Sequence, residues 1–157
     1  MNHDLCKRLA QVLLARGGSL ATAESCTGGM IAAACTDLSG SSAWFERGFV
    51  TYSNAAKVEC LGVDAALIAE HGAVSEPVAR AMAAGALAHS RATVAVAVTG
   101  VAGPTGGTAT KPVGMVCFGW SLGGQVFSEV RQFPGDRAAV RAATVEHALQ
   151  RLLDHLG

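Results

Sequence analysis

Ser25 is the residue whose type and position most directly suggest chemistry. It lies in the run Ala-Thr-Ala-Glu-Ser-Cys-Thr-Gly-Gly at residues 21–29, after a strand predicted over 19–23 and before an Ala-rich helix predicted over 28–36. The first N–H groups of a helix lack partners and carry partial positive charge, so an oxyanion or phosphate is stabilised there. Serine is also a preferred helix cap. The segment taken alone favours the cap.

A nucleophilic serine needs a base, and Lys57 is the candidate. The residues around Ser25 do not form the Gly-x-Ser-x-Gly elbow, and no histidine is placed nearby as a base, which argues against a Ser-His-Asp triad. Lys57 follows Tyr52, Ser53 and Asn54 in an otherwise apolar region, where burial would favour the neutral amine. A solvated surface lysine is the alternative for this residue taken alone.

Three loops at predicted strand ends outline a pocket: the Ser25 turn, residues 52–57, and the glycine-rich stretch 99–108. In open α/β sheets, ligands bind where such loops gather at the carboxyl ends of the strands. The glycine-rich stretch has neither the Gly-Lys-Ser/Thr ending of a P-loop nor the Gly-x-Gly-x-x-Gly spacing of a dinucleotide site. It can cradle a phosphate with its backbone N–H groups, or it can be a wide surface turn.

The composition limits the classes of partner. The 157 residues are half hydrophobic and carry 12 basic and 12 acidic side chains, without a run of Lys or Arg. Nothing therefore marks the chain for nucleic acid or an anionic membrane, and no stretch is apolar for long enough to span a bilayer. We expect one cytoplasmic domain over residues 1–157, with no nucleic-acid or membrane partner.

Neither the cysteines nor the histidines have the spacing of a metal site. The five cysteines (Cys6, Cys26, Cys35, Cys60 and Cys117) include no Cys-x-x-Cys pair, so we expect reduced residues, most of them in the core. The histidines at 3, 71, 89, 147 and 155 lack ligand spacings such as His-Glu-x-x-His. The sequence predicts no metal and no cofactor.

The remaining pattern predicts helices around a mixed sheet. Leu5, Leu9, Val12 and Leu13 stripe an opening helix that ends at Gly17-Gly18. Asn54 is predicted to cap a brief helix carrying Lys57, and Ser75 a longer one ending near Ser90. Strands are expected at 49–52, at 93–99 in the middle of the sheet, and at 113–121 and 125–132 as a hairpin. A last helix begins after Pro134-Gly135-Asp136 and is striped by Val145, Leu149, Leu152 and Leu156.

This order of elements predicts an α/β fold, a single-domain three-layer α/β/α sandwich with a mixed, mostly parallel sheet. Six motifs, in order, also resemble the CinA C-terminal domain family over nearly the whole chain. They are residues 23–29, Gly40-Ser41-Ser42 with Trp44-Phe45, Thr51-Tyr52-Ser53-Asn54 through Lys57, Gly72-Ala73-Val74-Ser75, Thr99 to Pro104 with Gly106-Gly107, and Lys111-Pro112-Val113-Gly114.

The resemblance implies an amidohydrolase that converts nicotinamide mononucleotide to nicotinate mononucleotide and ammonia. It implies a Ser/Lys mechanism without metal, in pyridine nucleotide (NAD) salvage. Ser25 would be the nucleophile and Lys57 the base, with Tyr52 or Asn54 helping to tune the lysine. The predicted substrate-binding residues are Glu24, Cys26, Thr27, Gly28, Gly29, Ser41, Ser42, Asn54, Thr99, Gly100, Gly103, Thr105, Gly106, Gly107, Arg137 and Arg141. Of these, the glycine-rich loop and the two arginines, one helical turn apart, are assigned to the phosphate.

Three alternatives stay open at this point. Ser41 or Ser42 can replace Ser25 as the nucleophile that meets Lys57. The domain can bind a nucleotide without hydrolysing it. It can also be an oligomeric interaction protein that assembles through apolar surface around Trp44 and Phe45. We assign Phe45 to the core, leave Trp44 open between core, ring stacking and interface, and expect a homodimer.

Overall fold

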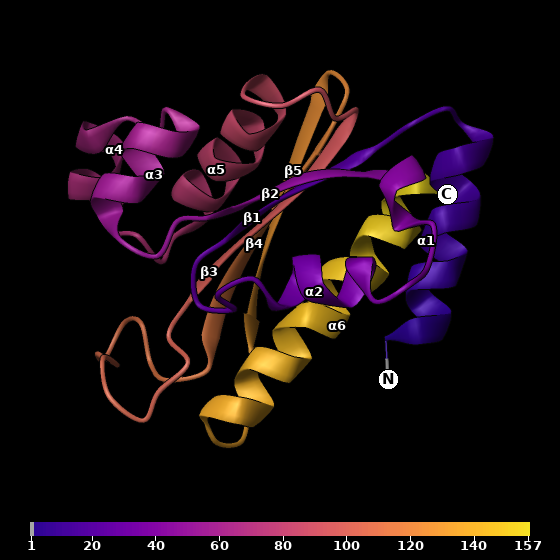
Figure 1. Cartoon of the computed structure of the whole chain (residues 1–157). Helices are drawn as coiled ribbons and strands as arrows, with labels where there is room; N and C mark the ends of the chain where they lie inside the picture. The colour runs from indigo at the N-terminus through magenta and orange to yellow at the C-terminus, as the bar shows by residue number, and fades with distance from the viewer. Residues whose placement is uncertain (1) are drawn as a thin grey trace.

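The computed structural model describes residues 2–157 and contains one five-stranded sheet (Figure 1). The strand order is β2-β1-β3-β4-β5; the pairs β2–β1 and β1–β3 are parallel, and β3–β4 and β4–β5 are antiparallel. Four strands therefore point the same way and β4 opposes them, as a mixed, mostly parallel sheet requires. The strands are β1 (Leu20–Glu24), β2 (Phe45–Val50), β3 (Val94–Gly100), β4 (Met115–Leu122) and β5 (Gln125–Gln132).

Helices cover both faces of the sheet, which confirms the predicted three-layer α/β/α sandwich (Figure 1). On one face lie α1 (His3–Ala15), α2 (Met30–Thr36) and α6 (Arg137–Leu156); on the other lie α3 (Asn54–Leu61), α4 (Ala65–His71) and α5 (Glu76–Ala88). The short 3₁₀ helix η1 (Ser41–Ala43) precedes β2. None of the helices in residues 2–157 is long and apolar enough to cross a membrane.

The two faces of the central strands explain how the layers pack. In β3, Val94, Val96 and Val98 face the core beneath α1, α2 and α6, whereas Ala95 and Ala97 face α5. Small side chains on the second face let α5 approach closely. A Cβ at Gly119 of β4 would lie only 2.3 Å from the carbonyl oxygen of Ala79 in α5, so glycine is required there. The burial of β3 on both faces confirms it as the central strand.

Most predicted boundaries lie close to the observed ones, but one strand start and one helix cap are wrong, and one helix was missed. The second strand starts at Phe45, four residues before the prediction, because an edge strand tolerates the polar Glu46 and Arg47 that hid it. Ser53 caps α3 by accepting a hydrogen bond from the backbone N–H of Ala56, so Asn54 is not the cap. Helix α4 was not predicted; it begins after Asp64, whose carboxylate accepts from the N–H of Ala66.

The structure also tests the predictions for Trp44 and Phe45 and for the cysteines. Trp44 is 2% exposed and belongs to the core, with Phe45 partly buried beside it, so an exposed Trp44–Phe45 interaction surface is wrong. All five cysteines are free, and only Cys60 is exposed.

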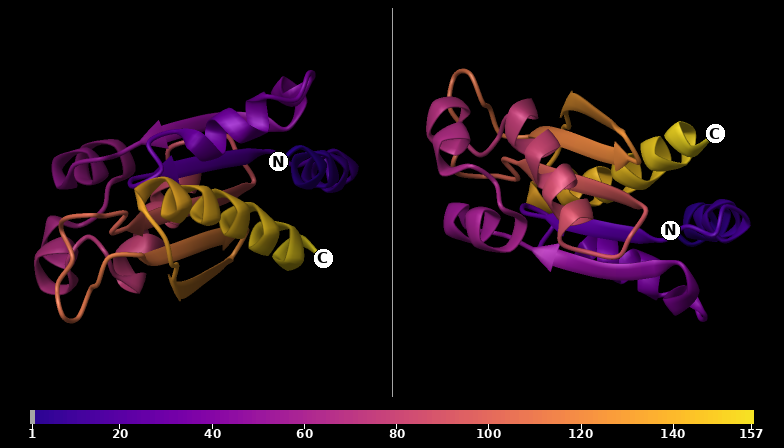
Figure 2. Two further views of the ribbon diagram at one scale, coloured as in Figure 1. Left: turned by 90° about the horizontal axis from the view of Figure 1, so that it is seen from below. Right: turned by 90° about the horizontal axis from the view of Figure 1, so that it is seen from above.

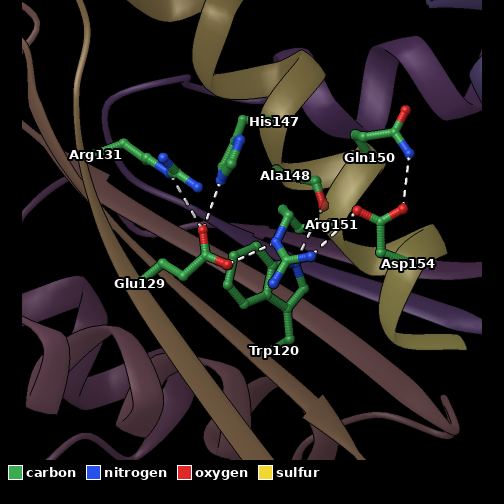
Figure 3. Close-up of polar contacts among 8 residues, drawn as sticks. All are labelled: Trp120, Glu129, Arg131, His147, Ala148, Gln150, Arg151 and Asp154. Atoms are coloured by element: carbon green, nitrogen blue, oxygen red, sulfur yellow. Dashed lines mark hydrogen bonds and ion pairs between the residues drawn. The ribbon is translucent and has the colours of Figure 1, made fainter.

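Helix α6 is joined to β4 and β5 by a polar cluster (Figure 3). The Glu129 carboxylate of β5 accepts hydrogen bonds from Arg151 Nε at 2.6 Å and His147 Nε2 at 2.9 Å. Arg131 approaches the same carboxylate at 3.4 Å, and the Trp120 indole N–H donates to the Ala148 carbonyl at 3.1 Å. Partial burial acts to raise the pKa of Glu129, but the hydrogen bonds from Arg151 and His147 outweigh it and lower the pKa.

Candidate active site

Ser25 and Lys57 meet at the carboxyl end of the parallel strands. Ser25 is the first residue after β1, and its N–H donates to the Val98 carbonyl of β3 at 3.1 Å. Thr51, just after β2, donates its N–H to the Glu24 carbonyl at 2.9 Å, which continues the β1–β2 pairing by one residue. The chain then enters α3, whose first turn carries Lys57 back over the strand ends. The Lys57 Nζ lies 3.2 Å from the Ser25 Oγ.

Lys57 is buried in neutral surroundings. Lys57 is 1% exposed. Besides Ser25, its Nζ contacts the backbone carbonyls of Thr51 at 3.0 Å and Tyr52 at 3.4 Å. Within residues 2–157, no acidic side chain forms an ion pair with it. Burial lowers the pKa of Lys57 below its usual value of 10.5, because removing an ammonium from water without a counter-ion is unfavourable.

The three contacts fit the neutral amine. A neutral lysine has two N–H donors and one lone pair. If the carbonyls of Thr51 and Tyr52 take the two hydrogens, the lone pair is left for the Ser25 hydroxyl. The geometry can therefore serve proton transfer from serine to lysine.

The turn after Ser25 is held by the chain's own groups. Gly28 and Gly29 have φ of 57° and 107°, the left-handed region that favours glycine, and α2 begins only at Met30. The buried Glu24 carboxylate accepts from the N–H groups of Ile31 at 2.8 Å and Ala32 at 3.0 Å. The positive end of α2 is thus occupied by Glu24, and the anion site predicted there is filled from within the chain.

Arg137 and Arg141 lie one turn apart on α6 but have different contacts. Arg141 donates to the carbonyls of Cys26 at 3.1 Å and Thr27 at 3.2 Å, and so braces the Ser25 turn. Arg137 donates to the Gly103 carbonyl at 2.9 Å and to the Tyr52 hydroxyl at 3.2 Å. Arg137 therefore links the glycine-rich loop to the segment before Lys57.

A cavity of about 380 Å³ opens over Ser25 and Lys57. The predicted residues that line it are Ser25, Cys26, Tyr52, Asn54, Lys57, Thr99, Gly100, Gly103, Thr105, Gly106 and Arg137. It is also lined by Ala73 and Val74, and by Val101 and Ala102 of the predicted pocket loop 99–108, none of which was predicted as an individual site residue. Within residues 2–157, no cluster of three or more His, Cys, Asp or Glu side chains is arranged to hold a metal ion.

The family model of the CinA C-terminal domain matches residues 2–156 of this chain. The chain belongs to the CinA C-terminal domain family. It is 56% identical over 149 residues to the nicotinamide-nucleotide amidohydrolase PncC of Pseudomonas putida, covering 95% of this chain and 93% of that protein. It is 52% identical over 150 residues to the PncC of Escherichia coli strain K12, covering 95% and 91%.

A solved CinA superfamily structure from Escherichia coli has the same fold. It superposes with a TM-score of 0.96 at 39% identity, over 99% of this chain and 90% of that one. The CinA C-terminal domain fold thus accounts for the described residues from end to end.

Several predicted residues lie outside the cavity of this CinA domain. Ser41 and Ser42 are in η1, before β2, whose first residue pairs with Leu20 at the start of β1. They are therefore at the amino end of the parallel strands, opposite Ser25 and Lys57. The other predicted residues that do not line the cavity are Glu24, Thr27, Gly28, Gly29, Gly107 and Arg141.

The residues that sequence reasoning missed contribute mainly backbone. The carbonyl of Thr51 holds Lys57, and the carbonyl of Ala73 accepts a hydrogen bond from the Thr99 hydroxyl at 2.9 Å. Every residue type has the same backbone oxygen, so the side chains of Thr51 and Ala73 give no sign of these roles. The only sequence signal was that both residues occur in the motifs that resemble the CinA family.

Cys26 is the other potential nucleophile in the cavity. It follows Ser25 directly and is 6% exposed. Burial, the largest influence, raises the pKa of its thiol to about 11. The thiolate is the reactive form of cysteine, so Cys26 is unreactive near neutral pH and Ser25 is the better nucleophile.

Proposed function

We propose that this chain is a nicotinamide-nucleotide amidohydrolase that converts nicotinamide mononucleotide to nicotinate mononucleotide and ammonia, in pyridine nucleotide salvage. The observation that carries the proposal is the 3.2 Å contact between the Ser25 Oγ and the buried, unpaired Lys57 Nζ. The identity to curated PncC proteins over 95% of the chain supports the substrate.

In the first half-reaction, Lys57 accepts the Ser25 proton as the Oγ attacks the carboxamide carbon. The carbonyl oxygen gains negative charge in the tetrahedral intermediate. The Cys26 N–H, which has no backbone acceptor in residues 2–157, is the candidate donor to that oxygen. Lys57 then gives its proton to the leaving nitrogen, the C–N bond breaks, and ammonia and a seryl ester remain.

In the second half-reaction, water attacks the ester while Lys57 accepts one of its protons. The ester C–O bond breaks, Lys57 returns the proton to Ser25, and nicotinate mononucleotide leaves as the carboxylate, its acid proton passing to solvent water. A lysine whose pKa is lowered by burial can accept and return a proton at smaller cost, whereas one with the ordinary pKa would need roughly 4 to 5 kcal/mol to lose its proton at pH 7.

The phosphate of the substrate needs a cation and backbone donors near the cavity mouth. We assign it to Arg137 and to the loop containing Gly103, Thr105 and Gly106, all of which line the cavity. Arg137 is well suited because its guanidinium is already held by the Gly103 carbonyl and the Tyr52 hydroxyl. Asn54 and Thr99 remain for the ribose and the carboxamide.

The test is ammonia release from nicotinamide mononucleotide with a chelator present. We expect activity in the native chain that falls about a thousandfold or more in Ser25→Ala and in Lys57→Ala. Ser41→Ala is the matched control and should keep native activity. Thermal stabilisation by the mononucleotide without turnover would instead identify a silent binding domain.

Survival of activity in Ser25→Ala would contradict the proposed nucleophile.

A further inference from the structure

Arg141 supports the Ser25 turn from outside the cavity. Its guanidinium donates to the Cys26 carbonyl at 3.1 Å and to the Thr27 carbonyl at 3.2 Å. Figure 2 shows why α6 can reach this turn: its first half lies beside the segment that joins β1 to α2. Arg141 does not line the cavity, whereas Arg137, one turn earlier on α6, does. The two arginines therefore meet different parts of the site.

The Cys26 carbonyl depends on Arg141 for its hydrogen bond. Within residues 2–157, no backbone N–H donates to this carbonyl, and the guanidinium does. The Thr27 carbonyl also accepts from the N–H of Met30 at 3.1 Å. A guanidinium is a rigid fork of donors, so two hydrogen bonds from it fix the orientation of two successive peptide groups. Arg141 therefore fixes the peptide group that follows Cys26.

The peptide group before Cys26 is fixed by the turn itself. The Ser25 carbonyl accepts from the Gly28 N–H at 3.1 Å. In a planar trans peptide the N–H points opposite to the carbonyl, so the Cys26 N–H is directed out of the turn and away from Gly28. Ser25 and Cys26 both line the cavity. The N–H between them is thus placed to meet the carbonyl oxygen of a substrate that Ser25 attacks.

The guanidinium of Arg141 also keeps its full charge beside this peptide. None of the ion pairs formed in the part of the chain that the structure describes includes it. Burial is the largest influence on the pKa of the Cys26 thiol and raises it; among the nearby charges, Glu24 raises it further, whereas Arg141 and Arg137 lower it. The charge of Arg141 therefore favours a negative charge at Cys26, where the tetrahedral intermediate develops one.

We propose that Arg141 is a positioning residue for the amide hydrolysis and does not bind the phosphate; this role rests on the proposed function. Arg141 holds the Cys26 peptide from the α6 side, so that the Cys26 N–H meets the oxygen that becomes negative. Its loss should slow the chemical step whether or not the substrate carries a phosphate. Loss of Arg137 should instead weaken the binding of the phosphorylated substrate.

Kinetics with two substrates test this role. Ammonia release is measured from nicotinamide mononucleotide and from nicotinamide riboside, which lacks the phosphate. Arg141→Gln should lower kcat about tenfold to a hundredfold on both and change KM less than about twofold, since losing an oxyanion donor outright costs about a hundredfold to a thousandfold. Arg137→Gln should raise the KM for the mononucleotide about tenfold and affect the riboside less.

Two further variants separate positioning from a general loss of structure. Arg151→Gln removes another α6 arginine, which binds Glu129 and Asp154 away from the cavity. It should lower stability but keep the native kcat of the folded chain. Arg141→Lys keeps the charge and one donor, so it should recover part of the kcat lost in Arg141→Gln. Circular dichroism gives the folded fraction of each variant, and Arg141→Lys serves for the comparison if Arg141→Gln does not fold.

The outcomes separate this role from the proposed function. A native kcat in folded Arg141→Gln, or a raised KM for the mononucleotide with unchanged riboside kinetics, would overturn the positioning role alone. An equal loss of kcat in Arg141→Gln and Arg151→Gln would overturn it as well, because the effect would then come from α6 as a whole. A native chain that releases no ammonia from either substrate would overturn the proposed function, and this role with it.

Discussion

Lys57 is buried and Glu129 is partly buried, but in the part of the chain that the structure describes only Glu129 has oppositely charged neighbours. Glu129, with a side chain 20% exposed, is approached by Arg131, His147 and Arg151. Lys57, 1% exposed, has polar contacts with one hydroxyl and two carbonyls among residues 2–157. The first arrangement lowers the pKa of a carboxylate and keeps it charged; the second lowers the pKa of an ammonium and favours its neutral form.

The difference separates a stabilising group from a reactive one. A charge that is neutralised by partners joins elements together, here β5 to α6. A buried base without a counter-ion costs stability but is available to take a proton. Changing each residue should therefore affect different observables.

The largest effect is expected from Lys57→Met. It removes the base while keeping an unbranched apolar chain, so kcat/KM for nicotinamide mononucleotide should fall about a thousandfold or more. The melting temperature should rise, because a buried, unpaired amine is replaced by a thioether, which we expect to be worth about 1 to 3 kcal/mol. Ammonia release and calorimetry measure the two effects. A variant that loses both activity and stability would show that Lys57 supports the fold instead.

The pH profile should give the next largest effect. Because the neutral amine is the base, kcat/KM should rise about tenfold per pH unit on the acid side of the Lys57 pKa and then level off. The midpoint should lie below 10.5, the ordinary value, since burial lowers this pKa. Rates should be taken above pH 7, where a substrate phosphate with a second pKa of about 6 is already dianionic. A midpoint at or above 10.5 would contradict the unpaired environment.

A smaller effect, on stability alone, is expected from Glu129→Gln. The substitution keeps the shape but leaves Arg151 and His147 without their carboxylate, which should cost about 1 to 3 kcal/mol in urea unfolding. Activity per folded chain should stay native, since the cluster is remote from the cavity. Arg47→Gln, which removes an exposed ion pair with Glu46, is the control and should change stability by less than about 1 kcal/mol.

The smallest effect is the pH dependence of that difference. The pKa of Glu129 is lower in the folded protein than its usual 4.5, so its contribution is complete above about pH 4.5 and is lost as the pH falls through the folded value. The difference in free energy of unfolding between the native protein and Glu129→Gln should therefore decrease between roughly pH 5 and pH 3. This range follows from the ordinary pKa of a glutamate carboxyl group. A gap that stays constant to pH 3 would mean that the cluster acts through shape and not through charge.

The sequence allowed the position of Ser25 and the identity of Lys57 to be predicted, but not their contact. Their residue types and the motifs around them are local. The 3.2 Å distance depends on the parallel pairing of β1 with β2, which brings Thr51 beside Glu24 and so aims α3 at the strand ends. Sequence reasoning placed that second strand too late, and it left Ser41 and Ser42 as rivals that the same pairing puts at the opposite end of the sheet.

Glu24 illustrates a second limit. An acidic residue next to a candidate nucleophile suggested a substrate contact. Instead its carboxylate closes the first turn of α2 and accepts from the Thr27 hydroxyl at 2.5 Å. The sheet and its buried central strand could be predicted from the hydrophobic pattern and composition of the sequence. The role of Glu24 could not, because it depends on the residue at which α2 begins.

The raised pKa of Cys26 has a consequence for how the site withstands damage. A thiol whose pKa is about 11 is almost wholly protonated near neutral pH, so it reacts slowly with alkylating agents and peroxide although it lines the cavity. Such reagents should modify the exposed Cys60 on α3 first. Deamidation by a hydroxyl nucleophile should therefore continue under oxidative conditions that inactivate enzymes dependent on a thiolate.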